Sequence, residues 1–339
     1  MTPWGNSFND THLLLLTDDT GIFQHTRYSI PDLSKGYTTD DNARAFILGT
    51  MLYEEKRTKE YLTLVMRYLA FILYAQNDDG HFRNFMTYSR EFTEDRGSED
   101  CFGRCFWALS YGMASSRLLK GIKSACASAI KLALPQIPLL QSARGQAYAI
   151  IGLGLLGAEY DDIIKKLADS LAAQYEHCAA KTSWYWFEDM LTYDNALLPW
   201  ALFVAFQQTK QVRFLQIAQQ SLLFLDQATF QEGFFHPIGC TGWWPRGSNA
   251  ALYDQQPVEA SMATLAHIAA FKITGEKKML SLAQQSFSWY LGKNSLGKSL
   301  IDPDTGGCFD GLTPTGVNEN QGSESIVGYG IAKLALSAV

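Results

Sequence analysis

The sequence is poor in cysteine, has no long apolar run and shows no excess of basic residues, and each shortage excludes a class of protein. Six cysteines in 339 residues are too few for a disulfide framework, and no two of them form a CxxC motif. No apolar run approaches the roughly 20 residues of a membrane-spanning helix. The start of the chain lacks the basic segment of a signal peptide, so we expect a reduced, cytoplasmic protein that does not contact membranes.

Charge and hydrophobicity narrow the classes further. The 28 lysines and arginines against 34 aspartates and glutamates give a net charge of −6, which argues against nucleic acid as a partner. Hydrophobic residues make up 47% of the chain, enough for a large core.

No segment rich in glycine, serine and proline divides the chain, and we therefore expect one domain over residues 1–339. The histidines and cysteines do not cluster, and we expect neither a metal nor a cofactor.

Six segments along the chain share one pattern, in which a polar or acidic opening is followed by alanine, glycine, serine and larger apolar residues. The openings follow one another at intervals of 45 to 67 residues, and each interval has room for two helices. The openings are centred on Asp40, Glu99, Arg144, Asp194, Gln256 and Ser323.

The two helices of each interval differ in character. The stretches 148–156 and 196–206 are apolar nearly all round, so they are expected to be buried on every side. The second helices have apolar residues at helical spacing on one face and charges on the other, which is typical of an outer layer. Buried inner helices alternating with amphipathic outer ones predict an all-α fold, the (α/α)6 toroid, with residues 8–17 as the last outer element. The other predicted outer helices are Lys59–Gln76, Leu118–Leu134, Asp161–Ala180, Gln211–Phe230 and Glu276–Lys293.

The openings of the inner helices are expected to meet at one mouth of the toroid, because the inner helices of such a ring run parallel. Helix N-termini carry partial positive charge and free N–H groups that favour acids, so N-capping explains part of this pattern. Acids recur at four of the six openings, which indicates a functional cluster. These acids are Asp40, Asp41, Glu99, Asp100, Asp194 and Glu324.

The segments that lead into the inner helices are long and rich in tryptophan and tyrosine, whereas the opposite connections are short. Aromatic rings stack on sugar rings while carboxylates bind hydroxyl groups, so this side predicts an oligosaccharide-binding mouth. Packing of the rings onto the barrel is the alternative. The arginines are interpreted as partners of buried carboxylates, and alternatively as holders of a substrate phosphate. The predicted substrate-binding residues are Tyr37, Arg44, Glu99, Asp100, Arg104, Arg144, Trp184, Trp186, Trp243, Trp244, Arg246, Glu259 and Glu324.

Two neighbouring stretches, TDDTGIFQHTRYSIPD and GYTTDDNARA, carry a family resemblance. With the toroid pattern, the chain resembles the six-hairpin glycosidase superfamily, and the adjacent Asp40 and Asp41 are similar to the paired aspartates of its α-mannan-degrading members. The same stretches are similar to a bacterial family of toroid proteins associated with glycosyltransferases and mannoside-processing enzymes. The resemblance implies an (α/α)6 fold, a mannoside or related substrate, and functional pairing with other carbohydrate-processing enzymes.

The leading hypothesis is a glycoside hydrolase that acts on oligosaccharides with two carboxylates. An acid at a helix N-terminus stays ionised and suits the base, which selects Asp41 or Asp194, while Asp40 orients Asp41 or binds substrate. An acid on an aromatic loop is desolvated, which raises its pKa and suits the proton donor. The candidates for the donor are Glu188, Asp189 and Asp254, with Glu259 and Glu324 as further carboxylates.

Three alternatives stay open at this point. A glycoside phosphorylase would bind phosphate through the arginines in place of water. A sugar epimerase or isomerase of this fold would use histidines on inner helices, where only His267 lies, within the apolar run SMATLAHIAAF that suits a core histidine. A glycan-binding toroid without catalysis would keep the aromatic residues and need no acid pair.

Overall fold

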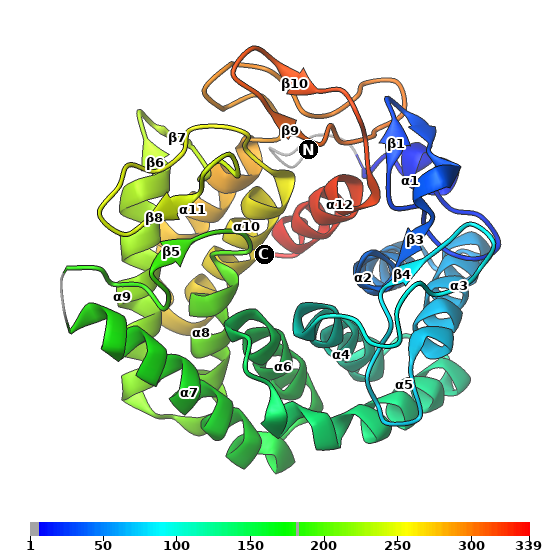
Figure 1. Ribbon diagram of the computed structural model, residues 1–339, viewed down its shortest axis with the longest axis horizontal. Helices are drawn as coiled ribbons and strands as arrows, with labels where there is room; N and C mark the ends of the chain where they lie inside the picture. The colour runs from blue at the N-terminus through cyan, green and yellow to red at the C-terminus, as the bar shows by residue number, and fades with distance from the viewer. Residues whose placement is uncertain (1–6, 181–182) are drawn as a thin grey trace.

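The computed structural model describes residues 7–180 and 183–339, and its helices form a closed double ring (Figure 1). Six helices with parallel directions make the inner ring, and the helix that follows each of the first five packs outside it. This arrangement is the predicted (α/α)6 toroid. The inner helices are α2 (Thr39–Lys56), α4 (Glu99–Ala114), α6 (Ala143–Leu156), α8 (Leu197–Thr209), α10 (Pro257–Thr274) and α12 (Ser323–Ser337).

The outer helices match the amphipathic stretches of the sequence within a few residues, except that the helix predicted over Glu276–Lys293 ends at Ser288. Each buries one face on its inner partner; in α3, for example, Leu64, Tyr68 and Ile72 are buried at helical spacing. The sixth outer position is filled by a helix of five residues, α1, which packs against α12. The outer helices are α1 (Thr11–Leu15), α3 (Lys59–Ala75), α5 (Lys120–Ala133), α7 (Asp161–Ala179), α9 (Val212–Thr229) and α11 (Lys277–Ser288).

Glycines let neighbouring inner helices approach closely, above all between α4 and α6. A Cβ atom added at Gly103 would lie 2.8 Å from the Cβ of Tyr148, and one at Gly145 would lie 3.0 Å from the carbonyl oxygen of Glu99. The first turns of α4 and α6 are therefore held side by side, because any larger residue at Gly103 would push the two helices apart.

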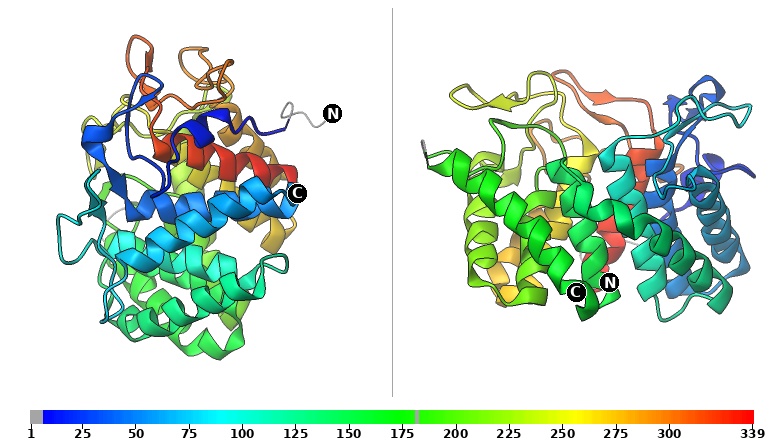
Figure 2. Two further views of the ribbon diagram at one scale, coloured as in Figure 1. Left: turned by 90° about the vertical axis from the view of Figure 1, so that its right-hand side faces the viewer. Right: turned by 60° about the horizontal axis from the view of Figure 1, so that its bottom comes forward.

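Short strands and long loops gather on the side where the inner helices begin (Figure 2). On the opposite side the connections are two to five residues long, such as 57–58, 210–211 and 115–119. Each strand has two residues and pairs with one antiparallel neighbour. The pairs are β1 (Thr26–Arg27) with β2 (Ile30–Pro31), β3 (Tyr37–Thr38) with β4 (Phe85–Met86), β5 (Met190–Leu191) with β8 (Trp244–Pro245), β6 (Phe230–Gln231) with β7 (Phe234–Phe235), and β9 (Gly311–Leu312) with β10 (Val317–Asn318).

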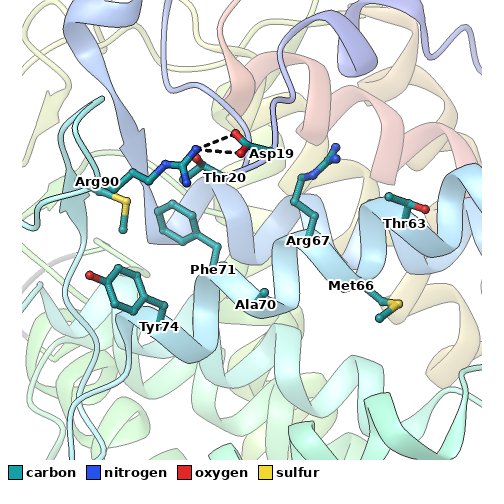
Figure 3. Close-up of a pocket in the computed structure, with 10 residues that line it drawn as sticks. Asp19, Thr20, Thr63, Met66, Arg67, Ala70, Phe71, Tyr74 and Arg90 are labelled. Carbon is teal, nitrogen blue, oxygen red and sulfur yellow. Dashed lines mark hydrogen bonds and ion pairs between the residues drawn. The ribbon is translucent and has the colours of Figure 1, made fainter.

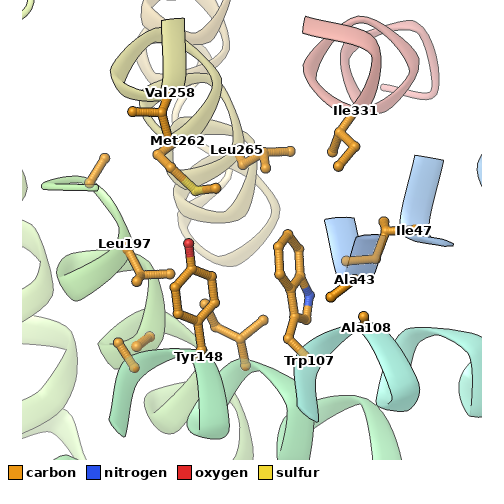
Figure 4. Packing of buried hydrophobic residues seen from close by; sticks show 14 of the residues in the cluster. Ala43, Ile47, Trp107, Ala108, Tyr148, Leu197, Val258, Met262, Leu265 and Ile331 are labelled. Carbon is orange, nitrogen blue, oxygen red and sulfur yellow. The ribbon is translucent and has the colours of Figure 1, made fainter. Parts of the chain in front are cut away.

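The inside of the ring is filled by side chains that all six inner helices contribute (Figure 4). Trp107 lies near the middle, with its ring stacked on Tyr148 at 5.6 Å and edge-on to Trp200 at 5.6 Å. Aliphatic side chains such as Ile47 and Ile331 close the space around it. Within the described residues, no helix is long and apolar enough to cross a membrane. The apolar layer forms a floor beneath the polar mouth described next.

Candidate active site

A pocket of about 570 Å³ opens where the inner helices begin, at the mouth that carries the long loops. Its wall combines first-turn residues of α4, α6, α10 and α12 with aromatic residues of two loops. Three of the six acids predicted from the helix openings, Glu99, Asp100 and Glu324, therefore line one pocket. The lining residues are Ser98, Glu99, Asp100, Arg104, Ser142, Tyr193, Trp243, Gln256, Val258 and Glu324.

Arg104, on α4, holds the centre of the mouth. Its guanidinium donates to Asp40 Oδ2 at 2.8 Å and to Asp194 Oδ2 at 2.7 Å. Its Nε also donates to the hydroxyl of Tyr148, at 3.3 Å, and that hydroxyl donates to Asp194 Oδ2 at 2.7 Å. Burial raises the pKa of both carboxyls, but Arg104 and Arg44 lower it more, so the pKa values of Asp40 and Asp194 lie below their usual range. Both carboxylates are ionised at neutral pH.

Arg44, on α2, makes the second such bridge. It donates to Asp41 Oδ1 at 2.6 Å and to Glu324 Oε2 at 3.0 Å, which ties the first inner helix to the last. Asp41 also accepts from the Thr38 hydroxyl at 2.6 Å. Its side chain is 6% exposed, and burial raises its pKa in spite of Arg44. The adjacent Asp40 and Asp41 thus have pKa values shifted in opposite directions.

Glu259, on α10, is buried close to Asp194, which is buried as well. Its Oε2 accepts from Asn195 Nδ2 at 2.9 Å, while its Oε1 and Asp194 Oδ1 are buried without a hydrogen-bond partner. Burial, and then the charge of Asp194, raise the pKa of Glu259 to about 8. Asp194 itself has φ of 50°, in the left-handed region that aspartate tolerates better than most residues. The mouth therefore holds a carboxyl group that is protonated at neutral pH.

Asp100 and Tyr193 form one wall of the pocket. Asp100 accepts from the Ser142 hydroxyl at 2.7 Å and from the Tyr193 hydroxyl at 2.5 Å. The Tyr193 ring lies 6.3 Å from the ring of Trp243, which comes from a different loop. Glu99, next to Asp100, accepts the backbone N–H of Gln141 at 2.8 Å and so fixes the start of α6. Two aromatic rings and two acids thus face one space.

Arg144, on α6, braces the loop that carries Tyr193. Its Nε donates to the carbonyl oxygen of Tyr193 at 2.7 Å, and its Nη2 donates to Thr192 Oγ1 at 2.7 Å. It also pairs with Glu188 at 3.0 Å, and its guanidinium lies 4.5 Å from the centre of the Tyr193 ring. Arg144 and Glu188 therefore hold the aromatic wall in place and are not among the residues that line the pocket.

Most of the predicted sugar-stacking aromatics lie elsewhere. Trp184 and Trp186 are buried, and Trp184 packs edge-on against Trp244 at 5.0 Å and against Phe224 at 5.2 Å. Tyr37 is buried too, and it donates to Asp18 Oδ2 at 2.6 Å. None of these four predicted residues lines the pocket, whereas Trp243 does.

Of the predicted charged residues, Glu99, Asp100, Arg104 and Glu324 line the pocket and the others do not. Asp189, Arg246 and Asp254 belong to loops outside the lining. Asp189 pairs with Arg246 at 2.8 Å on an outer loop, and the Asp189 side chain is 85% exposed. Asp254 accepts from the Thr241 hydroxyl at 3.2 Å. The Asp189–Arg246 pair joins two different loops, and the Thr241–Asp254 bond lies within one loop.

Sequence reasoning missed Tyr148, which contacts both Arg104 and Asp194. A signal was present, because Tyr148 follows Arg144 by four residues and therefore lies on the same side of α6, one turn deeper. Sequence reasoning also missed Asn195, which donates to Glu259. Tyr148 and Asn195 were both missed because each stands in a segment that is otherwise apolar.

Two other hollows have linings of a different kind. One, of about 440 Å³, lies at the opposite end of the ring and is lined mainly by apolar side chains such as Trp107, Trp200 and Ile273. The other, of about 550 Å³, lies on the outer surface of α3, where Arg90 and Asp19 pair at 2.8 Å (Figure 3).

No histidine is among the residues that line the mouth pocket. The described residues contain no group of three or more histidines, cysteines or acids that could hold a metal ion.

Comparison with known proteins gives a likeness of fold. No family model and no curated protein sequence matches the chain. A solved D-mannose isomerase is 10% identical with a TM-score of 0.74 and full coverage of both chains. A cellobiose 2-epimerase from Spirochaeta thermophila is 11% identical with a TM-score of 0.71, over 98% of this chain and 96% of that one. A GH76 α-mannanase from Bacteroides thetaiotaomicron is 11% identical with a TM-score of 0.66, over 98% and 94%. These likenesses confirm the predicted toroidal fold.

Proposed function

We propose that the chain is a carbohydrate-processing enzyme and, more specifically, a glycoside hydrolase whose reacting carboxylates are Asp40 and Glu324. The observation that carries this proposal is a pair of ion-paired carboxylates from different helices at the mouth: Asp40 pairs with Arg104 and Glu324 pairs with Arg44, and of these four residues Arg104 and Glu324 line the pocket. Glu324 lines the pocket with a side chain that is 39% exposed, and Asp40 is 16% exposed. Asp41, Asp194 and Glu259 are less accessible and act as positioning residues.

The chemistry follows from this arrangement. Glycoside hydrolysis needs one carboxyl group that protonates the leaving oxygen and a second that activates water or attacks the anomeric carbon. Asp40, kept ionised by Arg104 and Arg44, suits the second role. Glu324 reaches the open part of the pocket, so a leaving oxygen could be placed beside its carboxyl group, which takes the first role in this proposal. Tyr193 and Trp243 supply flat surfaces on which a sugar ring can stack.

The structure gives less support to phosphorolysis. Arg104 and Arg44 each bind two carboxylates, and Arg144 and Arg246 each bind one. A phosphate would have to displace a carboxylate from a guanidinium that already has its charge partner. Water is therefore the acceptor that the mouth favours.

The test is turnover of manno- and gluco-oligosaccharides, with and without phosphate, followed by mass spectrometry of the products. We expect free sugar in both conditions. We expect Asp40→Asn and Glu324→Gln each to lower the rate by at least about 100-fold, a loss in the range that one acid–base group contributes, while the fold stays intact by circular dichroism. Asp162→Asn, an exposed acid at the start of α7, serves as the matched control.

Three outcomes would overturn the assignment. Product formation only with phosphate would indicate a phosphorylase. Glycan binding without turnover would indicate a binding protein. Full activity of both carboxylate variants would place the chemistry elsewhere.

A second candidate is epimerisation or isomerisation of a sugar, which the names of the structurally similar epimerases and isomerase favour. Two carboxyl groups could move a proton next to a carbonyl carbon, with no change in product mass. Reaction in deuterated water separates this candidate from hydrolysis, because proton abstraction incorporates solvent deuterium into carbon and hydrolysis does not.

A further inference from the structure

Asp100 is a buried acid on the pocket wall that has no cationic partner. Its two oxygens accept from two neutral hydroxyls, those of Ser142 and Tyr193. No arginine, lysine or histidine of the described residues forms an ion pair with it, and the residue is 9% exposed. The first turn of α4 offers it only the partial positive charge of a helix end. A carboxylate buried in this way is stabilised by a cation placed beside it.

The rest of the pocket does not supply that cation. Arg104 is the only basic residue among the lining residues, and each of its three nitrogens already donates to another group, Nε to Tyr148, Nη1 to Asp40 and Nη2 to Asp194. Glu99 and Glu324 add two further acids to the lining, and Glu324 shares Arg44 with Asp41. The pocket therefore carries surplus negative charge, which a concave site concentrates.

The pocket also has the aromatic surfaces that accompany cation binding. Tyr193 donates to Asp100, and Trp243 lies 6.3 Å from the Tyr193 ring. Aromatic faces attract ammonium groups, and they also stack on sugar rings. One ligand that satisfies the carboxylate, the rings and the volume of about 570 Å³ is a sugar that carries a positive charge.

We infer that the mouth pocket binds an amino sugar, a hexosamine unit with a free protonated amino group, and that Asp100 is the residue that selects it over neutral and anionic sugars. The ammonium group pairs with Asp100 while the ring lies against Tyr193 and Trp243. This inference rests on the proposed carbohydrate function and adds a substrate class to it.

The test compares four sugars that share one ring: glucosamine, glucose, N-acetylglucosamine and glucuronate. Binding to the full chain is measured by calorimetry at pH 6, where the amine is protonated. We expect glucosamine to bind at least about ten-fold more tightly than glucose, N-acetylation to remove this preference, and glucuronate to bind most weakly. The preference should shrink in 0.5 M salt, because screening weakens charge interactions.

Asp100→Asn tests the residue itself. We expect it to bring the affinities for glucosamine and glucose together, so that the ratio of the two affinities falls to about one. Asp162→Asn, which removes the same charge from an exposed position on α7, should keep the preference. The four-sugar comparison on the unmodified chain decides the substrate class even if Asp100→Asn does not fold.

The outcomes separate the inference from the function on which it rests. Equal binding of glucosamine and glucose by the unmodified chain overturns the inference and leaves the proposed sugar site standing. A glucosamine preference that survives Asp100→Asn overturns the role of that residue. Failure of all four sugars, and of their oligomers, to bind overturns both the inference and the proposed function.

Discussion

Glu259 makes the stability of the protein depend on pH in a way that one substitution should remove. Its pKa is raised from 4.5 to about 8 by burial and by the charge of Asp194. Between these two pH values the unfolded chain ionises Glu259 while the folded chain keeps it protonated, so the folded state loses stability as pH rises. At about 1.4 kcal/mol per pKa unit the full loss is about 5 kcal/mol, of which about 3.5 kcal/mol falls between pH 5 and pH 8.

Glu259→Gln mimics the protonated side chain and keeps an acceptor for Asn195 Nδ2. We expect the difference in unfolding free energy between variant and wild type to shift by about 3.5 kcal/mol in favour of the variant from pH 5 to pH 8. Urea unfolding followed by tryptophan fluorescence at both pH values measures this shift. Glu60→Gln, at an exposed site of α3, is the control and should shift it by less than about 0.5 kcal/mol. If the unfolding free energies of Glu259→Gln and wild type changed by the same amount from pH 5 to pH 8, Glu259 would be ionised in the folded protein, and the reasoning would be refuted.

Three further predictions concern the mouth and its support. Arg104→Met leaves Asp40 and Asp194 buried without their cation, so urea unfolding at pH 7 should show a loss of about 3–5 kcal/mol; a loss below about 1 kcal/mol would mean that water replaces the guanidinium. Trp184→Ala should lower the unfolding free energy by about 3–5 kcal/mol, since its ring is buried, whereas Trp243→Ala should weaken glycan binding in calorimetry with little change in melting temperature. The reverse pattern would exchange the roles of the two rings. Gly103→Ala should cost about 1–3 kcal/mol in thermal unfolding, because its Cβ would lie 2.8 Å from the Cβ of Tyr148; an unchanged melting temperature would show that α4 and α6 can separate.

The ring itself could be predicted from the sequence because it depends on periodicity. Outer helices such as α3 and α7 show apolar and charged faces at helical spacing, and inner helices such as α8 show almost no charge. The last outer helix was predicted to reach Lys293, but it ends at Ser288, and the chain there turns into an irregular loop in which Asn294 bonds the carbonyls of Trp289 and Lys298. Such a boundary depends on hydrogen bonds that no periodicity records.

The details of the mouth could be predicted only in part. The clustering of Asp40, Asp100, Asp194 and Glu324 follows from the parallel inner helices, but the pairing does not. Arg104 pairs with acids 64 and 90 residues away in the chain, and this choice is set by how α2, α4 and the loop before α8 lie relative to one another. Spacing along the helices predicts two pairs, Asp41 with Arg44 and Asp100 with Arg104. The first pair forms, but the second prediction is wrong, because Arg104 pairs with Asp40 and Asp194 instead.

Aromatic residues were the weakest ground for prediction. Trp184, Trp186 and Trp243 have the same composition signal in the sequence, yet only Trp243 reaches the pocket. In a loop, neither helical nor strand periodicity tells which way a ring points, so burial is decided by tertiary packing. The cytoplasmic location, the single-domain assignment over residues 1–339 and the pairing with other carbohydrate-processing enzymes stay predictions.

The bridge from Arg44 to Glu324 joins residues 280 positions apart, and this has a consequence for how the protein reaches its working form. Each helical hairpin contacts mainly its neighbours in the chain, so the hairpins can form one after another as the ribosome delivers them. The mouth cannot form in this stepwise way, because the bridge from Arg44 to Glu324 joins the first inner helix to the last. A nascent chain that still lacks α12 holds Arg44 and Asp41 but no second carboxylate at that guanidinium. Ring closure is therefore the step that brings the second carboxylate to Arg44 and adds Glu324 to the lining of the pocket.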